Sequence, residues 1–333
     1  MRVLITGGAG FIGSHLAEAF LQRGDRVTVL DVGGGDKVRH LFADARFRFI
    51  RGSVLDALLV DRLVGDADMV YHLAAVVGVE HYVSAPLEVL EVNVNGTQNV
   101  LKAAFRHQRK VVFGSTSEVY GRNPNVPWSE DDDRVLGSTR VDRWCYATAK
   151  AVGEHFCFAY CRLGLPVTVL RFFNVYGPRL DTLEGGRVVS IFVGQALRND
   201  PITVIADGTQ TRCFTYIEDC VRAAVAAGIV QGTEGQIFNI GAEMETKIID
   251  LARLIRHLTN SRSEICFVAE QDVYGPYYED VHRRVPDVSK MHDILGVRAL
   301  TPLPEGLRRT IAWFRSEARE EDAAESYASR TQG

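Results

Sequence analysis

A glycine-rich turn near the N-terminus constrains the fold of this chain more than any other feature. Residues 2–6 form a short aliphatic and β-branched run, which predicts a buried strand. Gly7, Gly10 and Gly13 follow it at once, and apolar residues then recur at helical spacing until Gly24, a candidate helix C-cap. A strand that turns into a helix through three such glycines is typical of the first unit of a doubly wound parallel sheet.

Strand-like and helical segments alternate through the first half of the chain. The strand-like runs are 26–30, 47–51, 69–72, 110–114 and 167–172, and the helical patterns between them include 87–108 and 146–163. We therefore expect an α/β fold, with a Rossmann-type doubly wound parallel sheet in residues 1–174. Residues 175–315 are expected to form a smaller mixed α/β lobe for substrate, with some crossover of the chain. Residues 316–333 are charged and then small and polar, so we expect a flexible tail.

Composition excludes several classes of protein. The 333 residues carry a formal net charge of -4, whereas nucleic-acid-binding proteins usually have a basic excess, so we expect no nucleic-acid partner. No apolar run reaches the roughly 18 residues of a membrane span, and no signal peptide is apparent, so we expect no membrane partner. The cysteines lack zinc-like spacing, so we expect no metal site. Together these features favour a cytoplasmic enzyme with reduced thiols.

The glycine turn and a later acid predict a dinucleotide site. Gly7 permits the tight turn, Gly10 lets a pyrophosphate approach the backbone, and Gly13 allows the helix to pack closely on the strand. The diphosphate would lie at the helix N-terminus, where unpaired N–H groups favour an anion. Asp31 ends the second strand-like run, roughly 20 residues later, where a carboxylate hydrogen-bonds the adenosine ribose. Because that carboxylate repels a 2'-phosphate, we expect NAD and not NADP.

A tyrosine and a lysine form a candidate catalytic pair. Tyr146 and Lys150 stand four residues apart in a helical pattern, so both side chains lie on one helix face. A lysine ammonium near a phenol favours the phenolate, which can act as a base near neutral pH. Taken alone, the spacing favours an ordinary surface pair. The strand at 110–114 runs into residues 115–121 (STSEVYG), whose hydroxyls and carboxylate are expected to face the cofactor.

Three motifs together resemble one family. The glycine turn, the Tyr146-x-x-x-Lys150 pair and residues 171–178 (RFFNVYGP) are similar to the extended short-chain dehydrogenase/reductases that act on nucleotide sugars. The resemblance runs from residue 1 to about residue 314. It implies bound NAD, with contacts at Gly7, Gly10, Phe11, Ile12, Gly13, Asp31, Ser53, Val54, Leu73, Ala74, Ala75, Tyr146 and Lys150. It implies contacts to the nucleotide sugar at Thr116, Ser117, Glu118, Asn174, Arg187, Val204, Arg212 and Arg284.

Four phrases narrow the resemblance to a subgroup. Residues 115–121, 143–146, 177–181 and 274–280 look like those of UDP-glucuronate decarboxylases, including UDP-xylose synthases and the decarboxylase of the aminoarabinose pathway. The resemblance implies that UDP-glucuronate is oxidised at C4 with NAD, loses CO2 from the 4-keto acid and is reduced again to UDP-xylose. The implied catalytic residues are Thr116, Glu118, Tyr146, Lys150 and Arg284, of which Glu118 and Arg284 would govern protonation at C5.

The sequence leaves alternatives open. A 4-epimerase of UDP-glucuronate or a UDP-hexose begins with the same oxidation, although simple 4-epimerases usually carry a small residue at the position of Glu118. An NDP-sugar 4,6-dehydratase typically has Asp where Ser117 stands. A dinucleotide-binding regulatory protein would usually have lost Tyr146 or Lys150. Ser53 also departs from the family, which usually has Asp there, near the adenine.

Three further expectations concern packing. The helical patterns at 87–108 and 146–163 resemble those that pair across the family dimer, so we expect a homodimer. His72 lies on an apolar strand and is expected to be a satisfied core histidine. The acidic run 130–133 is expected to be a solvated loop.

Overall fold

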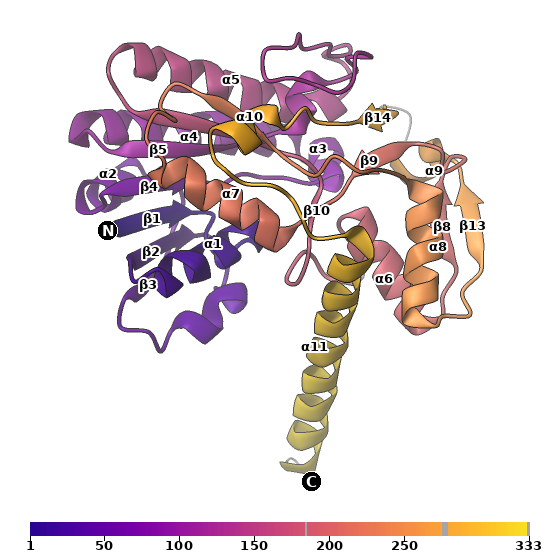
Figure 1. Cartoon of the computed structure of the whole chain (residues 1–333). Helices are drawn as coiled ribbons and strands as arrows, with labels where there is room; N and C mark the ends of the chain where they lie inside the picture. Colours follow the sequence, from indigo (N-terminus) through magenta and orange to yellow (C-terminus); the bar gives the residue numbers. More distant parts are fainter. Residues whose placement is uncertain (184, 275–278, 332–333) are drawn as a thin grey trace.

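A seven-stranded parallel sheet forms the centre of the molecule, here described by a computed structural model (Figure 1). The described residues are 1–183, 185–274 and 279–331. In spatial order the strands are β3 (Phe47–Arg51), β2 (Arg26–Asp31), β1 (Arg2–Thr6), β4 (Met69–His72), β5 (Lys110–Thr116), β6 (Val167–Phe172) and β11 (Ile237–Ile240). Every pairing in this sheet is parallel, which confirms the predicted doubly wound fold. The strand order reverses between β1 and β4, where such sheets bind their ligands.

Alternating side chains of the strands fill two separate cores. Val3 and Ile5 of β1 face one core, and Leu4 faces the other, because successive side chains of a strand point to opposite faces. Helices cover both faces, with α1 (Phe11–Gln22) and α7 (Ile217–Ile229) on one, and α2 (Ala57–Asp66), α4 (Pro86–His107) and α5 (Arg143–Arg162) on the other. Burial on both faces explains why these strands read as continuous apolar runs.

The chain returns to the main sheet after it has entered the smaller lobe. Helix α7 packs against α1, and β11 pairs in register with β6 at the edge of the sheet. Helix α10 (Ser289–Asp293) in turn contacts β11. The main sheet and its covering helices therefore take residues from both sides of the predicted boundary at residues 174 and 175, and the boundary itself stays a prediction.

The smaller lobe consists of short strands and helices beside the sheet (Figure 1). Its elements are β7 (Val175–Tyr176), α6 (Val188–Arg198), β8 (Ile202–Ile205), β9 (Thr211–Cys213), β10 (Thr215–Tyr216), β12 (Glu245–Lys247), α8 (Ile248–Thr259), β13 (Ile265–Val268), α9 (Glu270–Tyr274) and β14 (Arg283–Arg284). Strand β10 pairs with β7, β13 pairs with β8, and β9 lies between β12 and β14. Strand β8, which pairs with β13, packs against the helices α6 and α8, and these two helices contact each other.

The last helix, α11 (Leu303–Thr331), projects from the body of the molecule (Figure 1). Residues 316–331, expected to form a flexible tail, continue this helix, because their many Ala, Glu and Arg residues favour helix. The mobility of the segment stays a prediction. Residues 332–333 of the tail and residues 275–278 of the decarboxylase-like phrase lie outside the described residues. In the described part of the chain no helix has the length and apolar character that a membrane crossing requires.

His72 on β4 is a satisfied core histidine, as expected. The Thr97 hydroxyl donates to the Asn93 carbonyl oxygen over 2.6 Å, so its oxygen accepts from Nε2 of His72 over 3.0 Å. Nδ1 of His72 then accepts from the Thr6 hydroxyl over 2.7 Å. Burial lowers the pKa of His72 to about 3, so the imidazole is neutral at physiological pH.

Glu130 differs from the expected solvated loop. Its side chain is buried, and Oε1 accepts a hydrogen bond of 2.8 Å from the backbone N–H of Asn239. Burial raises the pKa of Glu130 above its ordinary value. The prediction failed because the loop folds back over β11, a contact between residues 109 apart in the sequence.

Candidate active site

The turn between β1 and α1 leaves no room for side chains at its glycines. Gly7 has a φ of +72°, and a Cβ atom there would lie 2.5 Å from the backbone nitrogen of Ala74. A Cβ atom on Gly13 would lie 2.4 Å from the carbonyl oxygen of Gly7. In the described chain α1 begins at Phe11 with no side-chain cap and no acid in its first turn, so its N–H groups suit an anion. The turn therefore fits a dinucleotide diphosphate.

Asp31 lies beside this turn, at the carboxyl end of β2. Its Oδ2 accepts from the backbone N–H of Ala9 and its Oδ1 from that of Gly33, both over 3.0 Å. These two bonds orient the carboxylate toward the region where a ribose would lie. The other predicted cofactor residues follow β3 and β4 at the same edge of the sheet: Ser53, Val54, Leu73, Ala74 and Ala75.

Thr116, Tyr146 and Lys150 meet where β5 ends against α5. The Thr116 side chain is close enough to the Tyr146 hydroxyl to lower the pKa of the phenol. Lys150 lies one helical turn after Tyr146, and its Nζ donates to the carbonyl oxygen of Gly114 over 2.7 Å. Nζ is 6.0 Å from the centre of the Tyr146 ring. Burial lowers the pKa of Lys150 to about 8.

The pKa of the Tyr146 phenol is higher than its spacing from Lys150 predicts. Burial raises the pKa of its phenol above the ordinary value, and the negative charge of Glu118 raises it further. Three groups lower the pKa of Tyr146 without cancelling this rise: Arg187, the Thr116 hydroxyl and Arg143. An ammonium nearby favours the phenolate, but in the protein alone burial outweighs that effect.

Glu118, in the short helix η2 (Ser117–Tyr120), lies between two arginines. Its Oε2 pairs with Nη1 of Arg143, and its Oε1 lies 3.4 Å from Nη1 of Arg284. The side chains of Arg143, Arg284 and Glu118 are 1%, 9% and 14% exposed. Burial alone would raise the pKa of Glu118, but the charges and hydrogen bonds of the two arginines lower it below its usual value. Glu118 is therefore a carboxylate at neutral pH.

A second ion pair borders this cluster. Strands β9 and β14 pair in parallel and place Arg212 beside Arg284. Nη2 of Arg212 lies 2.8 Å from both carboxylate oxygens of Asp280, and Asp280 is 3.9 Å from Nη2 of Arg284. Arg212, the predicted diphosphate ligand, is therefore held in place by a carboxylate.

Three residues of the site were not assigned a role from the sequence. Tyr82, on α3 (Val79–Ser84), stacks on Tyr146 with 4.9 Å between ring centres and 12° between ring planes. The guanidinium carbon of Arg143 lies 5.8 Å from the centre of the Tyr82 ring. Arg143 precedes Tyr146 by three residues in one helical pattern, a spacing that could have pointed to it, whereas Asp280 lies outside any helix and has no such signal.

The remaining predicted substrate residues differ in their surroundings. Asn174 has a φ of +36°, and its Nδ2 donates to the carbonyl oxygen of Cys213 over 3.3 Å. Arg187 precedes α6 and pairs with Asp181 over 3.0 Å. The side chain of Val204, on β8, is fully buried in the lobe core.

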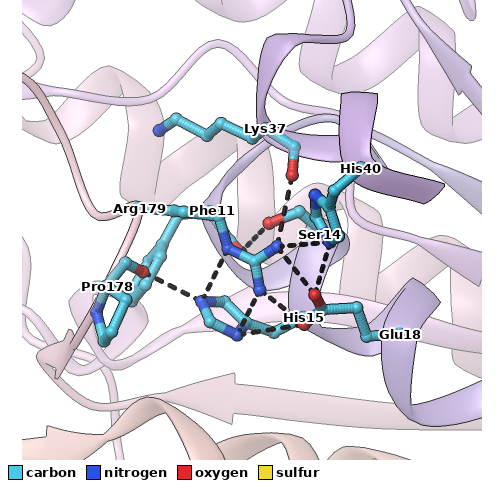
Figure 2. A network of polar contacts seen from close by, with 8 residues as sticks. All are labelled: Phe11, Ser14, His15, Glu18, Lys37, His40, Pro178 and Arg179. Carbon is cyan, nitrogen blue, oxygen red and sulfur yellow. Dashed lines mark hydrogen bonds and ion pairs between the residues drawn. The ribbon is translucent and has the colours of Figure 1, made fainter. Parts of the chain in front are cut away.

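Figure 2 shows how the loop after β7 is attached to the cofactor side of the molecule. Nη2 of Arg179 lies 2.6 Å from Oε2 of Glu18 and 2.6 Å from Nδ1 of His15. Nε2 of His15 bonds to the carbonyl oxygen of Pro178 over 2.9 Å. Glu18 and His15 belong to α1, and the attached loop leads to Arg187. The network thus connects the helix of the glycine turn to a predicted substrate arginine.

Comparisons with known proteins agree with this geometry. The model of the NAD dependent epimerase/dehydratase family matches residues 3–241. A UDP-N-acetyl-alpha-D-glucosaminuronate decarboxylase of Bacillus cytotoxicus is 43% identical, over 94% of this chain and 98% of its own length. UDP-glucuronic acid decarboxylase 1 of Xenopus tropicalis is 38% identical, over 95% of this chain and 72% of its own length. The solved UDP-glucuronic acid 4-epimerase of Bacillus cereus, in complex with UDP-glucuronic acid and NAD, has a TM-score of 0.85 and 31% identity, over 95% and 99% of the two chains.

The chain belongs to the NAD dependent epimerase/dehydratase family. It is an NAD-dependent enzyme of that family, and its glycine turn and Asp31 fit this cofactor.

Proposed function

We propose that the protein is a UDP-glucuronate decarboxylase that forms UDP-xylose. The observation that carries the proposal is the buried carboxylate of Glu118, paired with Arg143 and Arg284 close to Tyr146. The names of the relatives, which are decarboxylases of UDP-linked uronic acids, support it.

The residues of the site match the chemistry that this reaction needs. Bound NAD supplies the hydride acceptor for oxidation at C4 and the hydride donor for the final reduction. The Lys150 ammonium and the cationic nicotinamide of bound NAD favour the phenolate of Tyr146, which takes the proton of the 4-hydroxyl group, and Thr116 hydrogen-bonds the same oxygen. The product is a β-keto acid, so cleavage of the C5–C6 bond releases CO2 and leaves the electron pair as an enolate of the C4 ketone. Glu118 and Arg284 then direct a proton to C5 through water.

Incubation with UDP-glucuronate and NAD tests the reaction. We expect CO2 in a 1:1 ratio with UDP-xylose, followed by NMR of the nucleotide sugar. UDP-galacturonate without CO2 would reassign the protein as a 4-epimerase, and a 4-keto-6-deoxy sugar formed from an NDP-hexose would reassign it as a dehydratase. Release of the 4-keto pentose would support decarboxylation and would show that the final reduction does not occur.

Two variants separate the steps. In Glu118→Gln we expect C4 oxidation, read as NADH absorbance, to persist while steady-state CO2 release falls about 100-fold, because an enolate that is not protonated at C5 blocks further turnover. Tyr146→Phe is the matched control, because it should lose both signals. Unchanged CO2 release in Glu118→Gln would remove Glu118 from the C5 step.

A second candidate substrate is UDP-N-acetylglucosaminuronate, which carries an acetamido group at C2. The Bacillus cytotoxicus relative named for this substrate matches over 98% of its length. The two substrates undergo the same chemistry at C4 and C5, so a comparison of their kcat/KM values decides between them.

The protein is further proposed to form a homodimer through α4 and α5. These helices lie side by side, and Leu87 and Leu90 of α4 are 66% and 37% exposed. Apolar side chains on a paired helix surface suit a helical interface. The cytoplasmic location expected from the sequence stays a prediction, as do the individual cofactor and substrate contacts.

A further inference from the structure

A buried ion pair lies behind the reacting groups. Glu154 of α5 and Arg171 of β6 form two bonds, of 2.9 Å to Nε and 2.7 Å to Nη2 of the arginine. Their side chains are 7% and 6% exposed. The hydroxyl of Ser115 donates to Oε1 of the same carboxylate. Arg171 also donates to the Tyr120 hydroxyl and to the carbonyl oxygen of Glu130, both over 2.8 Å.

Glu154 is connected to the catalytic Lys150 in two ways. Glu154 follows Lys150 by four residues on α5, so the carboxylate and the ammonium lie on one helix face. Lys150 donates to the carbonyl oxygen of Gly114, and the next residue, Ser115, donates to Glu154. Two side chains of one helix therefore hold two adjacent residues of β5, immediately before the catalytic Thr116.

Among the described groups around Lys150, Glu154 is the one that carries a negative charge. The Cys157 thiol, also on α5, is buried and its pKa is raised well above the ordinary value, so it is neutral. His72 on β4 is neutral as well, and the Phe113 ring of β5 lies 5.0 Å from Nζ. Burial lowers the pKa of Lys150, and Cys157 and Glu154 oppose that fall. Because the thiol is not ionised, Glu154 carries the negative charge on this helix face at neutral pH, and Arg171 balances part of that charge.

We propose that Glu154 is a positioning residue for the reaction: held by Arg171 and Ser115, it keeps the Lys150 ammonium charged and fixes the end of β5. The role of Glu154 in catalysis rests on the proposed function, whereas its effect on the charge of Lys150 does not.

The charge of Lys150 can be measured directly in the NAD-loaded protein. The chain has six lysines, so 15N-lysine labelling gives few Nζ signals, and Lys150→Arg identifies the relevant one. We expect Glu154→Gln to lower the titration midpoint of Lys150 by about one pH unit. Glu154→Asp keeps the charge and should stay close to the wild-type midpoint. Glu130→Gln is the matched control, because Glu130 is a buried carboxylate of the same network that does not face Lys150.

The pH dependence of NADH formation from UDP-glucuronate provides the catalytic readout. Its alkaline limb should move down by the same interval in Glu154→Gln and stay in place in Glu130→Gln. If no turnover occurs with any UDP-uronic acid, the proposed function fails while the NMR titration still decides the inference. A folded Glu154→Gln protein with the wild-type Lys150 midpoint would overturn it.

Ser115→Ala keeps the test decisive if Glu154→Gln does not fold, because it retains the ion pair. It removes the bond between β5 and Glu154, so we expect kcat to fall about tenfold with KM and the Lys150 midpoint unchanged. An unchanged kcat would reject the positioning of β5 by Glu154.

Discussion

The two arginines around Glu118 control its charge and thereby the site. Arg143 forms the closer pair, is almost fully buried and also contacts Tyr82, whose ring stacks on Tyr146. One side chain thus connects the carboxylate proposed to act at C5 with the phenol proposed to act at C4. The sequence motif around Tyr146 contains this arginine, but only the fold shows that it faces Glu118.

Replacing Arg143 should change the acid limb of the pH profile. In Arg143→Gln, Glu118 stays buried with one cation 3.4 Å away, so its pKa should rise. Because the proposed relay of a proton through water uses the ionised carboxylate, we expect the acid limb of kcat to move to higher pH. Arg122→Gln is a suitable control, since Arg122 also lies over the Trp144 ring but pairs with Glu279. Coincident acid limbs in wild type and Arg143→Gln would contradict the assignment.

The alkaline limb should report Lys150. Its pKa is lowered to about 8, and its charged form is the one that assists Tyr146. We therefore expect the rate of NADH formation in the wild-type enzyme to fall as the pH rises through about 8. A rate that stays constant to pH 10 would show that the charge of Lys150 is not required.

At the scale of elements, the glycine turn has the least tolerance for change. In Gly13→Ala the new Cβ would meet backbone atoms of Gly7 and Gly8 at 2.4 and 2.6 Å, so the first turn of α1 must move. We expect NAD affinity, measured by calorimetry, to fall at least tenfold. Gly185→Ala meets nothing within 4 Å and should bind NAD like the wild type. Equal affinity in both variants would mean that the diphosphate does not lie at this turn.

The histidine of β4 should make stability depend on pH. The folded pKa of His72 is about 3 and its ordinary value is 6.5, so the unfolded chain binds a proton that the native state excludes. His72 makes its full contribution to the free energy of unfolding above pH 6.5. Below that pH the contribution decreases, by about 2 kcal/mol at pH 5. Urea unfolding at pH 7 and pH 5 should show a smaller loss in His72→Asn than in the wild type. Equal losses would indicate that His72 is already protonated in the folded protein.

The whole molecule is proposed to work as a dimer. We expect light scattering to give twice the mass of the chain, and Leu90→Arg to give monomers that keep the native circular dichroism spectrum. Leu58→Arg introduces the same charge on α2, at a residue that is 85% exposed, and should remain dimeric. A wild-type monomer at micromolar concentration would remove the proposed interface.

Local patterns were enough to predict the elements that build the site. Apolar runs located the strands of the first half, and the spacing of Gly7, Gly10 and Gly13 located the cofactor turn, because both depend on neighbouring residues. For the same reason Tyr146 and Lys150 could be placed on one helix face. Glu130 was misjudged because an acidic run looks the same whether its loop faces water or folds over a strand.

The sequence by itself therefore determined the class of fold, the cofactor turn and the candidate catalytic pair of Tyr146 and Lys150, all of which are encoded over short stretches. The tertiary structure decided which charges meet. Glu118 and Arg284 are 166 residues apart, and β11 joins the main sheet only after the chain has built part of the smaller lobe. Periodicity carries no information about such distant contacts, because the same arginine can face a carboxylate, a phosphate or water. The pairing of Glu118 with Arg143 and Arg284, on which the proposed decarboxylation depends, became visible only in the folded chain.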